Sequence, residues 1–267
     1  MNIAVVQFAP MLGRPGETRE RIRALSVDFA GCDLVVLPEL ANSGYAFVSA
    51  EQAWELSEDP GDSLFVKLLS EICRRHRQHI VTGFNERHAG ALYNSALLVG
   101  PDGVEGLYRK LHLFLDEKDI FRPGDVGLPT FEVAGCRLGL LICFDWRFPE
   151  VWRALALAGV DVICHPSNLV TQGLAQRATP VHAMVNHVYV ATANRVGTEG
   201  SFTFTGRSQI VAPSGEILAE ADAVEEKICR ARLDLSRARD KFVNRRNHLF
   251  NDRRPEVYGA LLDIESR

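Results

Sequence analysis

The sequence lacks the cysteine patterns that mark redox and zinc proteins. Its six cysteines are spread along the chain, at Cys32, Cys73, Cys136, Cys143, Cys164 and Cys229. No two of them form a Cys-x-x-Cys pair, which argues against a zinc ribbon or a thioredoxin-type site. We therefore expect all six thiols to be free in a reducing cytoplasm, and the question is whether one of them is a nucleophile.

Long apolar runs and an excess of one charge are also missing, and we expect no leader segment. No uninterrupted apolar run approaches the roughly 18 residues that a membrane helix needs. The 30 Lys and Arg residues nearly balance the 34 Asp and Glu residues, for a net charge of −4, which gives no overall attraction to nucleic acid or anionic lipid. The first residues, MNIAVVQF, carry no charged leader region. We expect neither a membrane partner nor a nucleic-acid partner.

The composition is that of an ordinary globular protein. Apolar residues make up 46% and charged residues 24% of the 267 residues, close to the average of soluble domains. No repeat or low-complexity segment divides the chain. We predict one domain over residues 1–267, in which residues 234–267 form a C-terminal arm at a subunit interface.

Strand-like and helix-like segments alternate along the chain. Short apolar or alternating runs predict strands at residues 3–8, 33–38, 79–84, 92–99, 104–108, 136–143, 160–166, 188–194 and 227–233. Spaced apolar residues predict helices at residues 17–30, 63–76, 149–159 and 178–187. This order predicts an α/β protein with mixed strands and with helices on the faces of the sheets.

Three of the short apolar runs lead directly into residues that can carry chemistry. Glu39 follows DLVVLP, Cys143 follows LGLLI, and Asn168 ends VICHPSN. Ligands of open α/β sheets bind beyond the carboxyl ends of the strands, so these residues are expected to share a pocket. Considered alone, each residue has a simpler interpretation. Cys143 would be a buried core thiol, and Glu39 would be a solvated carboxylate in a loop.

Lys110 completes a set with a chemical meaning. It lies among apolar residues in LYRKLHLF, where a buried ammonium is costly unless a carboxylate pairs with it. A thiol that attacks a carbonyl needs a base for its proton and a positive site for the oxyanion. Glu39, Lys110 and Cys143 supply the base, the positive charge and the nucleophile.

These segments resemble the motifs of the nitrilase superfamily of carbon–nitrogen hydrolases, over residues 3 to about 258. LPEL with the following SGY is similar to the family's glutamate motif, YRKLHLF to its lysine motif and CFDWRFPE to its cysteine elbow. EKDIFRPGD is similar to the segment with a second active-site glutamate, which falls on Glu117. HPSNLV and FTGRSQIVAPSGEIL match further family segments.

The resemblance implies an α-β-β-α sandwich of four layers, a homodimer or a larger assembly of it, and neither a metal nor an organic cofactor. In the implied roles, Cys143 is the nucleophile and Glu39 the general base. Lys110 and the backbone N–H of Phe144 stabilise the oxyanion. Glu117 positions Lys110 or the substrate and assists proton transfer.

The sequence also suggests roles for other residues near the cysteine motif. Trp146 is expected to wall the acyl pocket, with Asn168 as a further substrate contact. Arg147 is expected to pair with Glu150 or another acid rather than with a substrate carboxylate. Where family members commonly have a glutamate before asparagine in the segment HAMVN, this chain has Val185, which makes the hydrogen bonding at that helix less predictable.

Two alternative hypotheses about function involve other residues. His112 follows Lys110 by two positions and is a candidate for a papain-like pair with Cys143, although a structural histidine is favoured there. The segment from residue 230 to residue 254 contains nine Lys or Arg and three acids. One hypothesis is that this segment binds nucleic acid. The favoured hypothesis is that it is an arm at a subunit interface.

The expected reaction is hydrolysis of a small linear amide to a carboxylic acid and ammonia through a Cys143 thioester. The amide is favoured over a nitrile because CFDWRFPE resembles the amidase and carbamoylase branches, whereas a true nitrilase usually has Trp-Glu after its cysteine. Hydrolysis of an N-carbamoyl amine is the principal alternative. A nitrilase and a non-catalytic scaffold of the same fold are less favoured.

Overall fold

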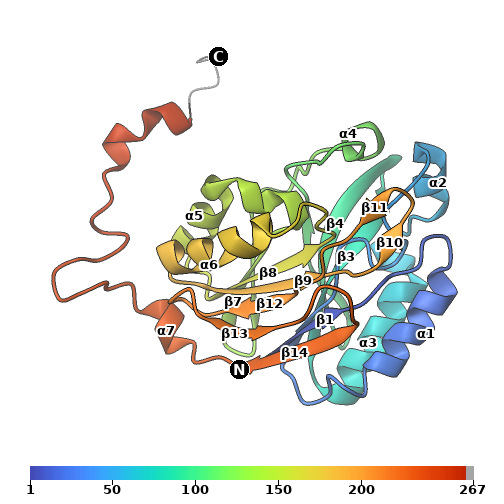
Figure 1. The fold of residues 1–267 in the computed structure, drawn as a ribbon, viewed down its shortest axis with the longest axis horizontal. Helices are drawn as coiled ribbons and strands as arrows, with labels where there is room; N and C mark the ends of the chain where they lie inside the picture. The colour runs from blue at the N-terminus through green and yellow to red at the C-terminus, as the bar shows by residue number, and fades with distance from the viewer. Residues whose placement is uncertain (263–267) are drawn as a thin grey trace.

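The computed structural model describes residues 1–262, in which two six-stranded sheets pack face to face (Figure 1). The strands of the first sheet run in the order β14-β1-β2-β3-β4-β5 and those of the second in the order β13-β12-β9-β8-β7-β6. β1–β3 pair in parallel, as do β7–β9, and the outer strands of both sheets pair antiparallel. A short hairpin, β10–β11, stands apart from both sheets.

The strands have the following bounds: β1 Asn2–Gln7, β2 Leu34–Val36, β3 His79–His88, β4 Ala91–Gly100, β5 Gly103–Arg109, β6 Thr130–Val133, β7 Cys136–Leu140, β8 Val162–Ser167, β9 Tyr189–Asn194, β10 Thr198–Glu199, β11 Phe202–Thr203, β12 Gln209–Val211, β13 Ile217–Glu220 and β14 Lys227–Arg232.

The helices have the following bounds: α1 Pro15–Leu25, α2 Ala50–Glu55, α3 Leu64–His76, α4 Glu117–Ile120, α5 Pro149–Leu157, α6 Leu174–Asn186 and α7 Ser236–Arg239, with 3₁₀ turns η1 Pro60–Asp62, η2 Cys143–Arg147, η3 Pro255–Val257 and η4 Gly259–Leu261.

Alternation along β1 shows how the four layers form. Successive side chains of a strand point to opposite faces of the sheet. Ile3 and Val5 enter the core between the two sheets, whereas Ala4 and Val6 pack in a second core with α1 and α3. α5 and α6 cover the outer face of the other sheet (Figure 1). The order α-β-β-α confirms the predicted four-layer sandwich.

The topology brings the predicted site residues to one edge. β2 and β3 are parallel, and β5 runs in the same direction as β3 because it is separated from it by the antiparallel β4. Glu39, after β2, and Lys110, after β5, therefore emerge at the same end of the first sheet. Cys143 and Asn168 follow β7 and β8 of the facing sheet.

The bounds of two predicted helices were wrong. The helix predicted at residues 17–30 is α1, which starts at Pro15 and ends at Leu25. The helix predicted at residues 178–187 is α6, which starts at Leu174 and contains Pro180. Proline removes the hydrogen bond to the carbonyl four residues earlier, and here that carbonyl, of Gln176, accepts from Gln209 Nε2 instead at 3.4 Å.

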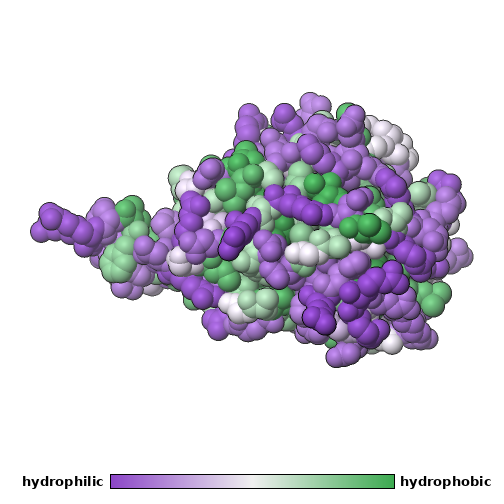
Figure 2. Space-filling view, turned by 90° about the horizontal axis from the view of Figure 1, so that it is seen from below, coloured by the Kyte–Doolittle hydropathy of each residue, from purple (hydrophilic) through white to green (hydrophobic). Residues whose placement is uncertain are grey.

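The chain after α7 projects from the sandwich, as Figures 1 and 2 show. Arg239 ties its start to the sandwich by donating to Asp161 at 3.0 and 2.9 Å. Lys241 donates to the carbonyl of His187 at the end of α6, at 2.6 Å. This segment lies within the predicted arm 234–267, whose last five residues, 263–267, lie outside the described residues.

Gly83 on β3 allows the Glu39 loop to approach the sheet. Its N–H donates to the Pro38 carbonyl at 3.0 Å, and its carbonyl accepts from the Ala41 N–H at 3.1 Å. A Cβ at this position would lie 2.2 Å from the Glu39 Cα, which is closer than nonbonded atoms can come. The sheet therefore positions Glu39 through a residue without a side chain.

We predict that Gly83→Ala lowers the free energy of unfolding by roughly 1–3 kcal/mol, because the added methyl overpacks a buried site, and that it impairs the site by displacing Glu39. Urea unfolding and the rate of alkylation of Cys143 measure the two effects. Gly16→Ala on α1 is the matched control, since its added methyl would meet only the end of the Arg19 side chain, at an ordinary contact distance of 3.9 Å. Equal stability of the two variants would contradict the argument.

Candidate active site

Glu39 is fully buried and is held from three sides. Its Oε1 accepts from Asn94 Nδ2 at 2.7 Å and from Lys110 Nζ at 2.7 Å, and its carbonyl accepts from Asn168 Nδ2 at 3.0 Å. Among the described residues, its Oε2 has no hydrogen-bond partner. A buried carboxylate with one oxygen fixed and the other unengaged is well suited to accept a proton.

Lys110 places a buried positive charge between two carboxylates. Its Nζ lies 2.7 Å from Glu39 Oε1 and 2.8 Å from Glu117 Oε1. Burial lowers the pKa of this ammonium, but the charges of Glu117 and Glu39 outweigh burial and raise it above its usual value. Lys110 is therefore a fixed cation at neutral pH. Because an ammonium has three N–H donors, one is left for a further acceptor.

Glu117, the first residue of α4, is the second carboxylate on this lysine. Its Oε1 also accepts from the Tyr45 hydroxyl at 2.9 Å, and its Oε2 accepts from the Phe114 N–H at 3.1 Å. Burial raises its pKa to about 7; the neighbouring Glu39 charge adds to the rise, and Lys110 opposes it. Burial therefore makes the neutral form of Glu117 more accessible than that of an exposed glutamate.

Cys143 begins the turn η2 with a backbone φ of 40°, which is unusual for a residue with a side chain. The strand was predicted to continue to residue 143, but β7 ends at Leu140. The chain turns because the carboxylate of Asp145 reaches back, and its Oδ2 accepts from the Ile142 N–H at 2.9 Å. Strained backbone of this kind often occurs at active sites.

His165 and Asp145 hold the turn in place. Burial lowers the pKa of His165 to about 4, so the ring is neutral. Its Nε2 donates to the Cys143 carbonyl at 2.9 Å, while Nδ1 lies 3.1 Å from Thr192 Oγ1. Asp145 also accepts from the Tyr108 hydroxyl at 2.7 Å. Sequence reasoning assigned no role to His165 or Asp145, since their contacts join distant segments.

His112 also contacts Asp145 rather than Cys143. Its Nδ1 lies 2.8 Å from Asp145 Oδ1, and its ring stacks on Phe148 with centroids 3.5 Å apart. The papain-like pair with Cys143 is therefore not formed. His112 has the structural role that the sequence favoured.

Cys143 opens into a cavity of about 340 Å³. The walls combine aromatic, aliphatic and polar side chains, with one arginine: Phe114, Phe144, Trp146, Arg147, Asn168, Leu169, Val170 and Thr171. The structure thus brings Phe144, Trp146 and Asn168 together with Cys143, as expected from the sequence. Glu39, Lys110 and Glu117 are buried from solvent and do not line this cavity.

The structure contradicts the ion pair that the sequence predicted for Arg147. Within residues 1–262, no carboxylate oxygen lies within 4.0 Å of its guanidinium, that of Glu150 included. The guanidinium instead lies over the indole of Trp146, 5.4 Å from the ring centroid.

Burial of Cys143 favours the protonated form of its thiol. Burial and the negative charge of Glu39 raise its pKa well above its usual value, against the opposing effects of Lys110 and the Asn168 N–H. A protonated thiol beside a carboxylate requires proton transfer at the moment of attack. The arrangement therefore supports general-base activation of a nucleophile near a fixed cation.

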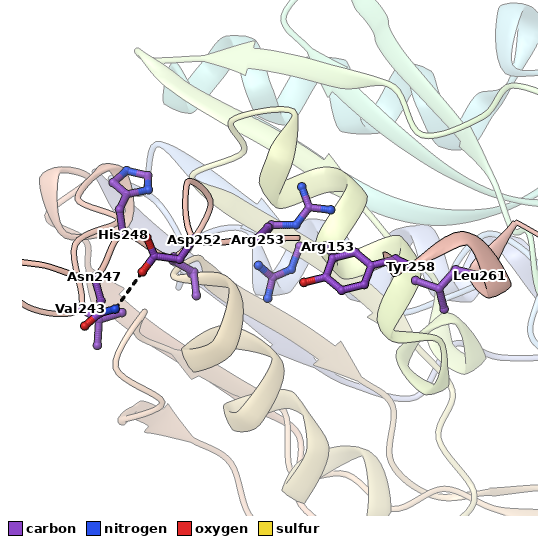
Figure 3. Close-up of a pocket in the computed structure, with 9 residues that line it drawn as sticks. Arg153, Val243, Asn247, His248, Asp252, Arg253, Tyr258 and Leu261 are labelled. Atoms are coloured by element: carbon purple, nitrogen blue, oxygen red, sulfur yellow. Dashed lines mark hydrogen bonds between the residues drawn. The ribbon is translucent and has the colours of Figure 1, made fainter. Parts of the chain in front are cut away.

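In residues 1–262, no cluster of three or more His, Cys, Asp or Glu side chains is placed to hold a metal ion. No helix of this part of the chain has the length and apolar content needed to cross a membrane. A cavity of about 510 Å³ between the C-terminal segment and Arg153 of α5 is lined by none of the predicted site residues (Figure 3).

The raised pKa of Glu117 predicts a pH-dependent difference in stability. A carboxyl whose pKa is higher in the folded than in the unfolded protein stabilises the fold at low pH, and this contribution is lost as the pH rises from about 4.5 to about 7. Glu117→Gln has no carboxyl at this position and therefore does not lose this contribution to stability as the pH rises. Its melting temperature relative to the parent protein should increase with pH across this window, as measured by calorimetry. A constant difference would contradict the assignment.

Comparisons with known proteins agree with this geometry. The chain matches the family described as Carbon-nitrogen hydrolase over residues 2–241. A protein named nitrilase from Pyrococcus abyssi is 42% identical over 97% of this chain and 99% of its own length. An N-carbamoylputrescine amidase from Solanum lycopersicum is 32% identical over 99% of this chain and 96% of its own.

A solved structure adds information on the cysteine. It shows a mutant of the amidase from Nesterenkonia sp. AN1 with acrylamide added to the active-site cysteine. That amidase structure superposes on this chain with a TM-score of 0.80 and is 26% identical in sequence. The match covers 98% of this chain and 99% of the amidase chain. Sequence motifs, four-layer fold and family match lead to one conclusion: the chain belongs to the carbon–nitrogen hydrolase family and is an enzyme of that family.

Proposed function

We propose that this enzyme hydrolyses a small amide to a carboxylic acid and ammonia through a thioester on Cys143. The observation that carries the proposal is the buried set of Glu39, Lys110 and Glu117 next to a buried thiol that opens into a cavity. Such a set can take the thiol proton and can stabilise an oxyanion.

The first half of the reaction forms the thioester. Glu39 takes the proton of the Cys143 thiol as the sulfur bonds to the carbonyl carbon, and the C=O electron pair moves to oxygen. The third N–H of Lys110 and the backbone N–H of Phe144 stabilise that oxyanion. When the pair returns, the C–N bond breaks, Glu39 passes the proton to nitrogen, and ammonia leaves.

The second half hydrolyses the thioester. Water adds to the thioester carbon and gives a proton to Glu39, and the intermediate collapses with cleavage of the C–S bond. Glu39 then returns the proton to sulfur. The cycle consumes one water and yields the acid, ammonia and the free thiol. Throughout, Glu117 positions Lys110, which it contacts at 2.8 Å.

Hydrolysis of an N-carbamoyl amine is the second candidate, since the same attack on a carbamoyl carbon releases ammonia and, after hydrolysis, carbon dioxide and the amine. The similarity to an N-carbamoylputrescine amidase supports it. The similarity to a protein named nitrilase supports a nitrile substrate, but Phe-Asp rather than Trp-Glu follows Cys143. A non-catalytic scaffold accounts for none of the buried charges of the site.

We predict that Cys143→Ala lowers ammonia release from a panel of amides, ureides and nitriles by roughly four orders of magnitude or more, because the nucleophile is lost. Cys164→Ala is the control: it removes the thiol of a fully buried cysteine on β8 that does not line the cavity, and it should retain turnover. Circular dichroism checks that both variants fold. Undiminished turnover by Cys143→Ala would rule out the mechanism.

The thioester predicts a covalent adduct at one position. Intact-mass spectrometry after rapid acid quenching, followed by peptide mapping, should locate the acyl group on Cys143 and leave Cys136 and Cys164 unmodified. Both of those thiols are fully buried, and neither lines the cavity into which Cys143 opens. An acyl group on either of them would contradict the assignment of the nucleophile.

We also propose that the enzyme is a homodimer or a larger assembly of it, with α6 and the C-terminal arm at the interface. Val181, Met184 and Val185 form an exposed apolar stripe on α6, with exposed fractions of 51, 46 and 38%. Phe242 and Leu261 of the arm are exposed as well. Contiguous exposed apolar surface marks interaction sites, and a valine at position 185 suits an apolar contact.

If α6 lies at the subunit interface, a charge placed on its exposed apolar stripe should dissociate the assembly into monomers. Val181→Glu should shift the mass in solution toward that of the monomer, because it places a charge in an apolar contact, and light scattering at several concentrations measures the shift. Val27→Glu is the control, since Val27 is 72% exposed and follows α1 on the other helix layer. A parent protein that is monomeric throughout would contradict the proposal.

We further propose a reducing, cytoplasmic location. All six cysteines are free and buried, and proteins of oxidising compartments commonly pair their thiols.

A further inference from the structure

The β10–β11 hairpin belongs to neither six-stranded sheet, so no pairing with those sheets holds it against the active site. The carboxylate of Glu199 on β10 makes that connection instead. Its Oε1 accepts from the N–H groups of Tyr45 and Ala46 at 2.6 and 2.8 Å, and its Oε2 accepts from Arg195 Nη2 at 3.1 Å. Glu199 therefore joins the hairpin to the loop that follows Glu39.

Burial makes this contact a fixed one. The side chains of Arg195 and Glu199 are 2 and 9% exposed, and a buried charge is costly unless partners surround it. In the part of the chain that the structure describes, Glu199 is the one carboxylate within 4.0 Å of Arg195. Arg195 also donates to the Pro10 carbonyl at 3.0 Å and lies 4.2 Å from the centroid of the Phe204 ring. The carboxylate that holds the Tyr45 loop is thus itself held in place.

Tyr45 links this contact to the catalytic charges. Its ring packs edge-on against Phe202 of β11 and Phe204, with centroids 5.5 and 5.9 Å apart. Its buried hydroxyl donates to Glu117 Oε1 at 2.9 Å, and the same oxygen accepts from Lys110 Nζ at 2.8 Å. The hydroxyl therefore restricts how the Glu117 carboxyl meets the ammonium.

We propose that Glu199 and Tyr45 are positioning residues of the active site. The hairpin carboxylate fixes the backbone at Tyr45, and the Tyr45 hydroxyl orients Glu117 on Lys110. The inference rests on the proposed amidase function and adds a supporting element to its site. Neither residue lines the Cys143 cavity, so both act on the reaction through Glu117.

Tyr45→Phe tests the link to Glu117, because it removes the hydroxyl and keeps the ring. It should lower kcat for an amide substrate by about tenfold to a hundredfold, the effect of one hydrogen bond to a charged group. KM should change little, since the cavity wall is intact. Tyr189→Phe is the matched control: it removes a buried hydroxyl that donates to the Asp234 carbonyl at 2.9 Å. Equal losses in the two variants, or a loss through KM alone, would overturn the role of Tyr45.

A second measurement reports on Glu117 and needs no turnover. A hydroxyl that donates to a carboxylate favours its ionised form, so Tyr45→Phe should raise the pKa of Glu117 above its parent value of about 7. Adding Glu117→Gln to each background gives a melting-temperature difference that levels off once Glu117 is ionised. That difference should level off near pH 7 with Tyr45 and at a higher pH with Phe at this position. An unchanged pH range would show that Tyr45 has only a structural role.

Variants of Glu199 test the hairpin. Glu199→Ala should lower kcat as Tyr45→Phe does, and Glu199→Gln, which keeps an acceptor oxygen for the two N–H groups, should recover part of the loss. Glu132→Ala is the control, since Glu132 on β6 pairs with Arg137 at 2.8 Å on the exposed surface. Circular dichroism checks folding, and Glu199→Gln provides the test if Glu199→Ala does not fold.

The outcomes separate the two proposals. An undiminished kcat in folded Glu199→Ala, or in both Glu199→Gln and Tyr45→Phe, would overturn the positioning role of the hairpin. A shifted pKa of Glu117 in a protein that turns over no amide would instead overturn the proposed function.

Discussion

The active site depends on one buried ammonium shared by two carboxylates. Lys110 is out of contact with water, and burying an ion is expensive unless partners surround it. Glu39 and Glu117 are those partners, and they come from different segments, after β2 and on α4. Loss of one partner leaves the remaining charges unbalanced in a medium of low polarity. The lysine therefore fixes how the two loops are placed relative to each other.

The two sheets supply the rest of the geometry. Parallel strands bring Glu39 to the same edge as Lys110, and the facing sheet brings Cys143 and Asn168 to it. Gly83 lets the Glu39 loop lie directly against β3. His165 holds the carbonyl of Cys143 from β8. Function thus depends on the packing of two sheets rather than on any single loop.

Much of this architecture follows from the sequence, and the remainder shows what local patterns leave out. Apolar runs locate the core strands, and the motifs around Glu39, Lys110, Glu117 and Cys143 identify the residues that the fold gathers. The end of β7 was predicted three residues too late, because Leu141 and Ile142 continue the apolar pattern through the turn that Asp145 makes. Pro180 lies inside α6 because a glutamine far along the chain satisfies the freed carbonyl.

The resting state of Cys143 also has a consequence for the chemistry of oxidants. Peroxides and disulfides react with the thiolate far faster than with the thiol. A nucleophile that keeps its proton until a substrate carbonyl is in place is a poor target for them, whereas a permanently ionised cysteine would be exposed to oxidation between turnovers. A buried thiol whose pKa is raised by burial and by a neighbouring carboxylate therefore presents less thiolate to these oxidants than an exposed cysteine does.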